Sequence, residues 1–360
     1  MISNNRLRFR TFAAGILLVG TVMAGNSDRA GQAGGTQLLI NPFVRSSGWG
    51  SANSASVMGL EAQYLNVAGV AHTEKTEILA ARTNWLVGTG ISINSFGFSQ
   101  KLGNASALAF GVMAMDFGDI NVTTVEQPEG NIGTFKPQFL NMNLSYAKEF
   151  SNSIFGGINV KVISENIANL KASGVCFDGG IQYVTAFGKD KELKRKNVHF
   201  GIALKNVGPQ VKYQGDGLSS KANLTSTGAA QTLEFRSQAY DLPSLVNIGA
   251  SYDYYLSKEN NNQRITAALN FTSNSFTQDQ FNIGFEYGFK QIFMLRAGMV
   301  YEKGIFNADE RKTALTGPTA GFSADVPLGK ESKRKFGIEY SYRTTNPFAG
   351  VHSIGLRLKL

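Results

Sequence analysis

From residue 76 onward, hydrophobic and polar residues alternate along the chain with a period of two. Between residues 279 and 289 the apolar parity is Phe281, Ile283, Phe285, Tyr287 and Phe289, and the polar parity is Asn282, Gly284, Glu286 and Gly288. Residues 138–148, 244–255, 335–343 and 351–360 alternate in the same way. Strict alternation predicts β-strands that have one apolar face and one polar face.

The length of these segments favours strands that cross a membrane. Most run to about ten residues, which is the length that a tilted strand needs to span a bilayer. Their polar parity carries full charges and glycines, as the interior of a barrel does. The alternative is a soluble β-sandwich, which would place its charges toward solvent and use shorter strands. The pattern favours an all-β fold, a transmembrane antiparallel β-barrel.

We count fourteen strand candidates, an even number that is typical of a closed bacterial barrel. They lie near 76–86, 91–101, 106–117, 137–149, 153–164, 172–185, 198–205, 244–256, 263–273, 279–289, 292–302, 317–327, 335–344 and 351–360. The barrel is therefore predicted to occupy residues 76–360.

The connections between these strands also fit a barrel. The three longest are 118–136, 206–243 and 303–316, and all three fall at the same end when the strands are placed up and down in order. Outer-membrane barrels carry short turns on the periplasmic side and long loops outside. Residues 210–231 are rich in Gly, Ser, Thr and Asn, so we expect them to order only on a partner.

Residues 1–24 have the pattern of a secretory signal peptide. Three arginines precede an apolar run at 12–20, and Val22-Met23-Ala24 follows as a small-residue cleavage site. A membrane anchor is the alternative, but the apolar run is shorter than the roughly 20 residues that span a bilayer. We expect export from the cytoplasm and residence in the bacterial outer membrane, in contact with its lipid.

Residues 25–75 differ from the rest because small residues dominate and bilayer-length alternation is missing. Such a segment is predicted to fold inside the barrel as a plug. A phosphate-binding loop is the alternative reading of its glycines, but no Gly-Lys-Ser/Thr follows them. The glycines more simply permit close backbone packing in the lumen.

The composition gives little indication of a catalytic, metal or nucleic-acid-binding site. The formal charge is +9, three of those charges lie in the predicted signal peptide, and the rest are spread over turns, so nucleic-acid binding is not expected. Cys176 is the single cysteine, and the three histidines stand apart in sequence, so neither a metal site nor a cofactor is predicted. We predict that the chain is not an enzyme.

Charged residues on the polar parity have two interpretations. Glu286 and Glu339 would form a hydrolase-like acid pair in a catalytic interpretation. The structural interpretation is a lumenal charge ladder, which we favour because buried charges need partners. The residues of this ladder are Glu286, Arg296, Glu339, Arg343 and Arg357.

The N-terminal segment resembles the opening signature of the PorV/PorQ family. The likeness lies in residues 45–52, RSSGWGSA, and 61–69, EAQYLNVAG, with the plug-motif residues Arg45, Gly48, Gly50, Asn66 and Gly69. Further echoes occur at 206–209 and 340–343. The chain has Asn66-Val67 where an Asn-Pro is common in the family, and it ends in Leu360 where many outer-membrane barrels end in an aromatic residue.

The resemblance implies a FadL-like barrel with its N-terminal part in the lumen. It also implies a component of the type IX protein secretion machinery of Bacteroidetes-type bacteria, binding exported cargo or partner secretion proteins through long extracellular loops. The alternative is a FadL-like transporter of hydrophobic small molecules. An apolar pocket beside the plug would favour a lipid-like ligand, and a polar, filled lumen would favour none. The polar parity of the strands favours the filled lumen.

Overall fold

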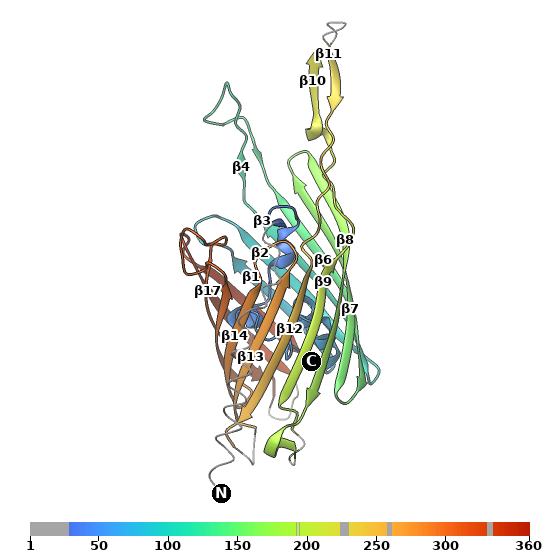
Figure 1. Ribbon diagram of the computed structural model, residues 1–360, viewed down its shortest axis with the longest axis vertical. Helices are drawn as coiled ribbons and strands as arrows, with labels where there is room; N and C mark the ends of the chain where they lie inside the picture. The colour runs from blue at the N-terminus through green and yellow to red at the C-terminus, as the bar shows by residue number, and fades with distance from the viewer. Residues whose placement is uncertain (1–28, 192, 194, 224–229, 258–260, 330–333) are drawn as a thin grey trace.

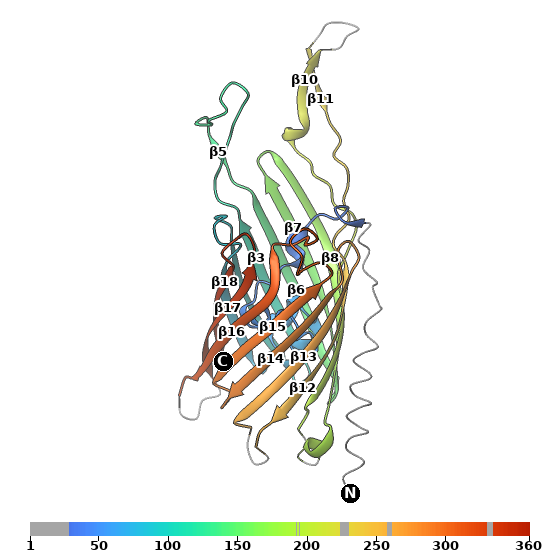
Figure 2. The same cartoon turned by 60° about the vertical axis from the view of Figure 1, so that its left-hand side comes forward.

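The computed structural model describes residues 29–360 except 192, 194, 224–229, 258–260 and 330–333. In this part of the chain, fourteen antiparallel strands form one closed barrel. Each barrel strand pairs with the next barrel strand along the chain, and the first, β1, pairs with the last, β18. Figures 1 and 2 show the strands tilted around the barrel. Closure leaves no strand edge unpaired toward the lipid, which is the condition for spanning a bilayer with strands. The signal peptide predicted at 1–24 lies outside the described residues.

The barrel strands follow the predicted segments closely. They are β1 (Thr76–Asn84), β2 (Ser92–Leu102), β3 (Ser106–Asp116), β6 (Gln138–Ser151), β7 (Ile154–Ile167), β8 (Leu170–Thr185), β9 (Val198–Val207), β12 (Leu245–Tyr255), β13 (Gln263–Asn274), β14 (Gln280–Phe289), β15 (Phe293–Glu302), β16 (Leu315–Pro327), β17 (Lys335–Thr345) and β18 (Val351–Lys359). The predicted fourteen-stranded barrel is confirmed.

The long connections all leave the barrel at one end, which we call the loop end, and the opposite end is the turn end (Figure 1). Two of them form small ribbons that alternation did not predict: β4 (Ile120–Asn121) pairs with β5 (Thr134–Phe135), and β10 (Ser219–Asn223) pairs with β11 (Ala230–Glu234). Part of the stretch 210–231 lies in β10 and β11, and the expectation that it orders only on a partner stays a prediction. Backbone hydrogen bonds across the ribbon need no apolar side chains, so the composition gave no signal for it.

The two strand parities face different environments, as predicted. Large apolar side chains on one parity are exposed on the outer surface, including Leu144, Ile158, Ile202, Leu269 and Leu356, with exposed fractions of 48–62%. On the other parity, polar residues such as Asn143, Asn159 and Glu286 are buried. An apolar outer belt around a polar interior is the pattern of an outer-membrane barrel.

Most of the described residues that precede β1 lie within the barrel, where Figures 1 and 2 draw them in blue. They form η3 (Thr36–Leu39), α2 (Val44–Gly48), η4 (Leu60–Tyr64) and η5 (Val67–His72). We call residues 29–75 the N-terminal segment. In the described part of the chain, no helix has the length and apolar character needed to cross a membrane.

Candidate functional site in the lumen

An ionic cluster joins the N-terminal segment to the barrel wall. Arg357 in β18 is 3% exposed and contacts three carboxylates. Its Nη2 lies 2.9 Å from Glu61 Oε2, its Nε lies 2.6 Å from Glu339 Oε1, and its Nη1 pairs with Glu77. Glu61 belongs to η4 and the other two carboxylates to the wall. The guanidinium therefore holds the segment against strands from both ends of the chain.

Arg45 extends the same cluster from the side of the N-terminal segment. Its Nε donates to Glu339 Oε1 at 2.6 Å, and its Nη2 donates to Asp325 Oδ1 at 2.5 Å. Glu61 also accepts from the backbone N–H of Ser46 at 2.5 Å, which ties η4 to α2. Buried charges of this kind stabilise a fold only when each is paired, and here the pairs cross between segment and wall.

The glycines of the N-terminal segment lie where backbones approach closely. A Cβ on Gly48 would lie 3.0 Å from Gly321 Cα in β16, and one on Gly69 would lie 2.1 Å from the Val57 carbonyl oxygen. Gly50 has φ +65°, a conformation that side chains disfavour. The segment therefore packs against itself and against the wall without intervening side chains.

Asn66, the remaining residue of the plug motif, fixes the end of the segment. Its Oδ1 accepts from the backbone N–H of Ala68 at 3.2 Å, and so caps η5. Its Nδ2 donates to the carbonyl oxygen of Ile181 in β8 at 3.0 Å. One amide thus serves both the local turn and the contact with the wall.

A second charged group lies beside this cluster, on strands β13, β14 and β15, and lines the same turn-end cavity as Arg45, Glu61 and Arg357. Glu286 accepts from Arg264 Nη2 at 2.5 Å and pairs with Arg296 Nε at 2.7 Å. Glu286 and Glu339 therefore each pair with arginines of the lumen, as in the charge-ladder interpretation. Among the described residues, no three His, Cys, Asp or Glu side chains gather as metal ligands would.

Part of the lumen is apolar, which the alternation did not show. Inward-facing Leu79, Ile93, Met113 and Met115 of β1, β2 and β3 pack with residues of the N-terminal segment. Their partners include Phe43, Val57, Leu60, Tyr64 and Leu65. The interior is apolar on this side because it meets a folded segment and not water. Burial of this surface adds to the ionic contacts in holding the segment.

The start of the N-terminal segment contacts the long connection between β9 and β12 at the loop end. Glu165 in β7 accepts from Gln37 Nε2 at 2.7 Å, from Tyr240 Oη at 3.0 Å and from the Tyr213 hydroxyl. Burial, together with the Glu165 carboxylate, raises the pKa of Tyr213 and of Tyr240. Arg29 pairs with Asp241 at 3.0 Å in the same region.

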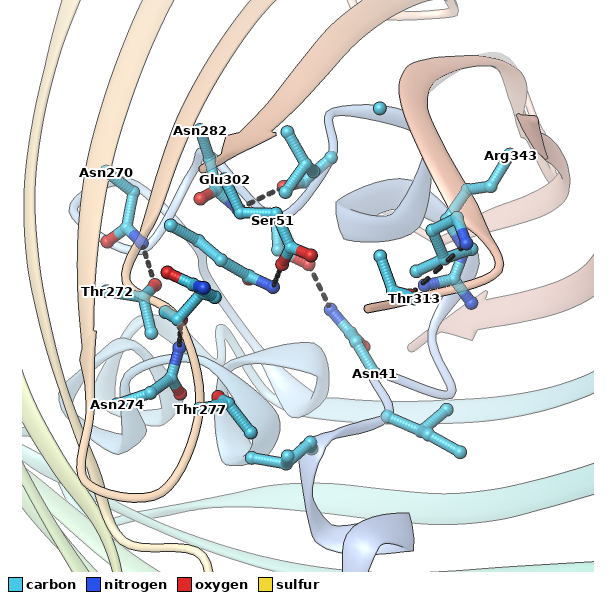
Figure 3. Close-up of a pocket in the computed structure, with 18 of the residues that line it drawn as sticks. Asn41, Ser51, Asn270, Thr272, Asn274, Thr277, Asn282, Glu302, Thr313 and Arg343 are labelled. Carbon is cyan, nitrogen blue, oxygen red and sulfur yellow. Dashed lines mark hydrogen bonds between the residues drawn. The ribbon is translucent and has the colours of Figure 1, made fainter. Parts of the chain in front are cut away.

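A cavity of about 420 Å³ lies between the N-terminal segment and the wall toward the loop end (Figure 3). Ligand pockets typically measure roughly 300–1,000 Å³. Its apolar side chains include Leu39, Ile40, Leu65, Leu245, Val300 and Ile305. Its carboxamides are Asn41, Asn247, Asn270, Asn274, Gln278, Gln280 and Asn282. The cavity is therefore neither wholly apolar nor wholly polar. It matches neither of the two alternatives considered from the sequence, an apolar pocket beside the plug or a polar, filled lumen.

Several cavity side chains are held by a connected set of hydrogen bonds. Asn270 accepts from Ser54 at 2.5 Å and donates to Thr272 at 2.8 Å, and Thr272 donates to Asn247 at 2.8 Å. Asn247 in turn donates to the Leu65 carbonyl oxygen at 3.3 Å. This wall is fixed before any ligand arrives, which lowers the entropic cost of binding.

Arg343, the last of the predicted lumenal charges, lies at this cavity and apart from the ionic cluster. Its guanidinium lies 5.1 Å from the Trp85 ring centroid, and its Nε and Nη2 have no hydrogen-bond partner among the described residues. Sequence alternation placed Arg343 on the inner face but gave no sign that its charge is unpaired. It also gave no sign of Glu61, Glu77 or Asp325 as partners in the cluster.

Comparisons with known proteins establish the fold. No protein-family model and no curated protein matches the chain. Among solved structures, the Pseudomonas putida toluene transporter TodX matches with a TM-score of 0.53 and 10% identity, over 89% of this chain and 97% of that one. A ΔS2S3 mutant of the TodX monoaromatic hydrocarbon channel matches with a TM-score of 0.50 and 12% identity, over 87% and 96%.

A FadL homologue from Pseudomonas aeruginosa is also similar, with a TM-score of 0.48 and 12% identity, over 88% of this chain and 97% of that one. The chain has the barrel fold of the TodX structures. The reported structures do not bear on the resemblance to the PorV/PorQ family, which stays a prediction.

Proposed function

We propose that this chain is a non-catalytic outer-membrane transporter of small, partly hydrophobic molecules, the alternative that the sequence left open. The observation that carries the proposal is the cavity of about 420 Å³ between the N-terminal segment and the wall. TodX, which shares the barrel fold, is a toluene transporter, and this favours a small ligand with an apolar body.

The cavity has the properties of a binding site on an uptake path. It lies toward the loop end, which we assign to the cell exterior because outer-membrane barrels carry their long loops there. Leu65, Leu245 and Val300 offer apolar surface, while the hydrogen-bonded Asn247, Asn270 and Thr272 fix its shape. A ligand captured here would reach the periplasm once the N-terminal segment shifts.

Filling the cavity tests the proposal. Val300 lines the cavity, whereas its neighbour Tyr301 points outward and is 40% exposed. Val300→Trp should abolish uptake of a labelled monoaromatic compound by cells that carry the protein, and Tyr301→Trp should leave uptake unchanged. Equal uptake by both variants, at equal amounts of heat-modifiable protein in the outer membrane, would reject a transport role for the cavity.

A second candidate is the secretion component that the PorV/PorQ resemblance implies. The β10–β11 ribbon supports it, because the ribbon projects far beyond the barrel (Figures 1 and 2). The side chains of Leu233 in β11 and of Phe235, which follows β11, are exposed. Removing residues 219–234 should then impair secretion of type IX cargo and leave monoaromatic uptake intact. Normal secretion in a strain that lacks the whole gene would reject this candidate.

A further inference from the structure

Two sets of lumenal cations differ in their partners. Toward the turn end, Arg45, Arg264, Arg296 and Arg357 each have at least one carboxylate at 2.5–2.9 Å. In the cavity toward the loop end, neither Arg343 nor Lys205 has an ion-pair partner among the described residues, although Lys205 is only 7% exposed.

The balance of charge in this cavity is positive. Among the described residues that line it, the basic side chains are Lys205, Lys312 and Arg343, and the one carboxylate is Glu302. Glu302 already accepts from Gln280 Nε2 at 3.1 Å. A desolvated guanidinium without a carboxylate is costly, so an occupant that supplies an anionic group is favoured over a neutral one.

The cavity also presents an acceptor without a donor. Asn282 is 5% exposed, and its Nδ2 donates to the carbonyl oxygen of Gly50 at 2.5 Å. Since that carbonyl oxygen only accepts, the amide nitrogen must face it, which leaves Oδ1 for another donor. Asn282 Oδ1 has no partner among the described residues. Figure 3 shows Asn282 and Arg343 on different sides of the cavity.

We propose that the loop-end cavity binds a compact hydroxylated carboxylate with an apolar body, of which a hydroxybenzoate is the simplest example. The carboxylate pairs with Arg343 beside the Trp85 ring, and the hydroxyl group donates to Asn282 Oδ1. The body of the ligand packs on Leu65, Leu245 and Val300. This inference rests on the proposed transport function and narrows its substrate class, because a plain hydrocarbon would leave Arg343 and Asn282 unpaired.

Four para-disubstituted benzenes test this assignment by calorimetry on the detergent-solubilised full chain. 4-Hydroxybenzoate carries both polar groups, 4-methylbenzoate and p-cresol carry one each, and p-xylene carries neither. 4-Hydroxybenzoate should bind most tightly, with about tenfold lost for each polar group that a methyl replaces.

Variants then assign the carboxylate to its partner. Arg343→Gln should weaken 4-hydroxybenzoate by about tenfold and leave p-cresol unchanged. Arg82→Gln is the matched control, because Arg82 lies in β1 on the outer parity and is exposed. The comparison of the four compounds on the wild type keeps the assignment testable should Arg343→Gln fail to fold.

The outcomes separate this inference from the proposed function. If p-xylene binds as tightly as 4-hydroxybenzoate, or if Arg343→Gln binds 4-hydroxybenzoate like the wild type, the assignment of the ligand class is overturned and the transport function stands. If none of the four compounds binds, both are overturned.

Discussion

Glu61 Oε2 lies 2.9 Å from Arg357 Nη2, so the N-terminal segment is paired with the last strand of the barrel across 296 residues of sequence. Glu61→Gln should destabilise the folded barrel by about 3 kcal/mol, because it removes a charge from a buried cluster. Urea unfolding in detergent measures the loss. The same variant should raise the ion current through single proteins in planar bilayers, since the segment is less firmly held.

The control for this prediction is Glu74→Gln, which makes the same chemical change at an exposed position of the N-terminal segment. It should alter neither stability nor current. Equal behaviour of the two variants would show that the ion pair does not hold the segment in place.

Adjacent glycines in β8 give a second prediction. A Cβ on Gly180 would lie 2.2 Å from Asn66 Oδ1, whereas one on Gly179 would meet nothing within 4 Å. Gly180→Ala should therefore displace Asn66 and cost about 1–3 kcal/mol, as overpacking typically does. Gly179→Ala should be neutral. Unfolding midpoints of the two variants measure the contrast, and a tolerated Gly180→Ala would mean that Asn66 is not closely packed on β8.

The apolar outer belt predicts that the loss of stability caused by a charged substitution depends strongly on its position. Leu269 in β13 is 50% exposed on the outer face, and Leu269→Arg should destabilise the lipid-embedded protein by about 2–4 kcal/mol if it lies near the bilayer midplane. Leu233→Arg, on the projecting ribbon, should cost almost nothing. Equal stability of both variants in vesicles would contradict the assignment of this face to lipid.

The stability of the N-terminal segment should depend on pH through His72. Burial and the neighbouring His199 lower the pKa of His72 to about 4, and its ring lies 4.1 Å from that of Phe155. The unfolded chain takes up this proton near pH 6.5 and the folded chain only near pH 4. The free energy of unfolding should therefore fall as pH drops from about 6.5 to 4, by about 3 kcal/mol from this group.

His72→Gln should remove that part of the decline, because glutamine does not titrate. His352→Gln, near the loop end, should retain it. The measurement is the urea midpoint at several pH values for the wild type and both variants, and identical pH profiles for all three would contradict the prediction.

The barrel could be predicted from alternation because each wall residue faces either lipid or lumen. Neighbouring residues in the sequence are enough to show which face each one occupies. β14 and β17 alternate without exception over the residues that defined them. The N-terminal segment lacks this alternation. Its richness in small residues predicted a plug, but the sequence did not predict which wall residues it contacts. The partners of Arg357 and Arg45 lie in other elements, some nearly 300 residues away, and only closure of the barrel brings them together.

The cavity could not be predicted from the sequence for the same reason. Arg343 sits on the polar parity like Arg296 and Arg357, and nothing in the neighbouring sequence distinguishes a paired arginine from an unpaired one. Leu79 and Met113 face inward on an apolar side of the lumen, where alternation alone suggested a polar interior. Which inward positions are apolar depends on what fills the barrel at that height, and this is a property of the folded segment.

The route of the N-terminal segment constrains how the molecule assembles. Ala33 pairs with Asp241 at one mouth of the barrel, and β1 begins at Thr76 at the other mouth, so the chain runs through the whole ring before it enters the wall. Arg357 of the last strand pairs with Glu61 near the middle of this segment. We therefore expect the segment to be in place before the barrel closes, so that β1 and β18 pair last.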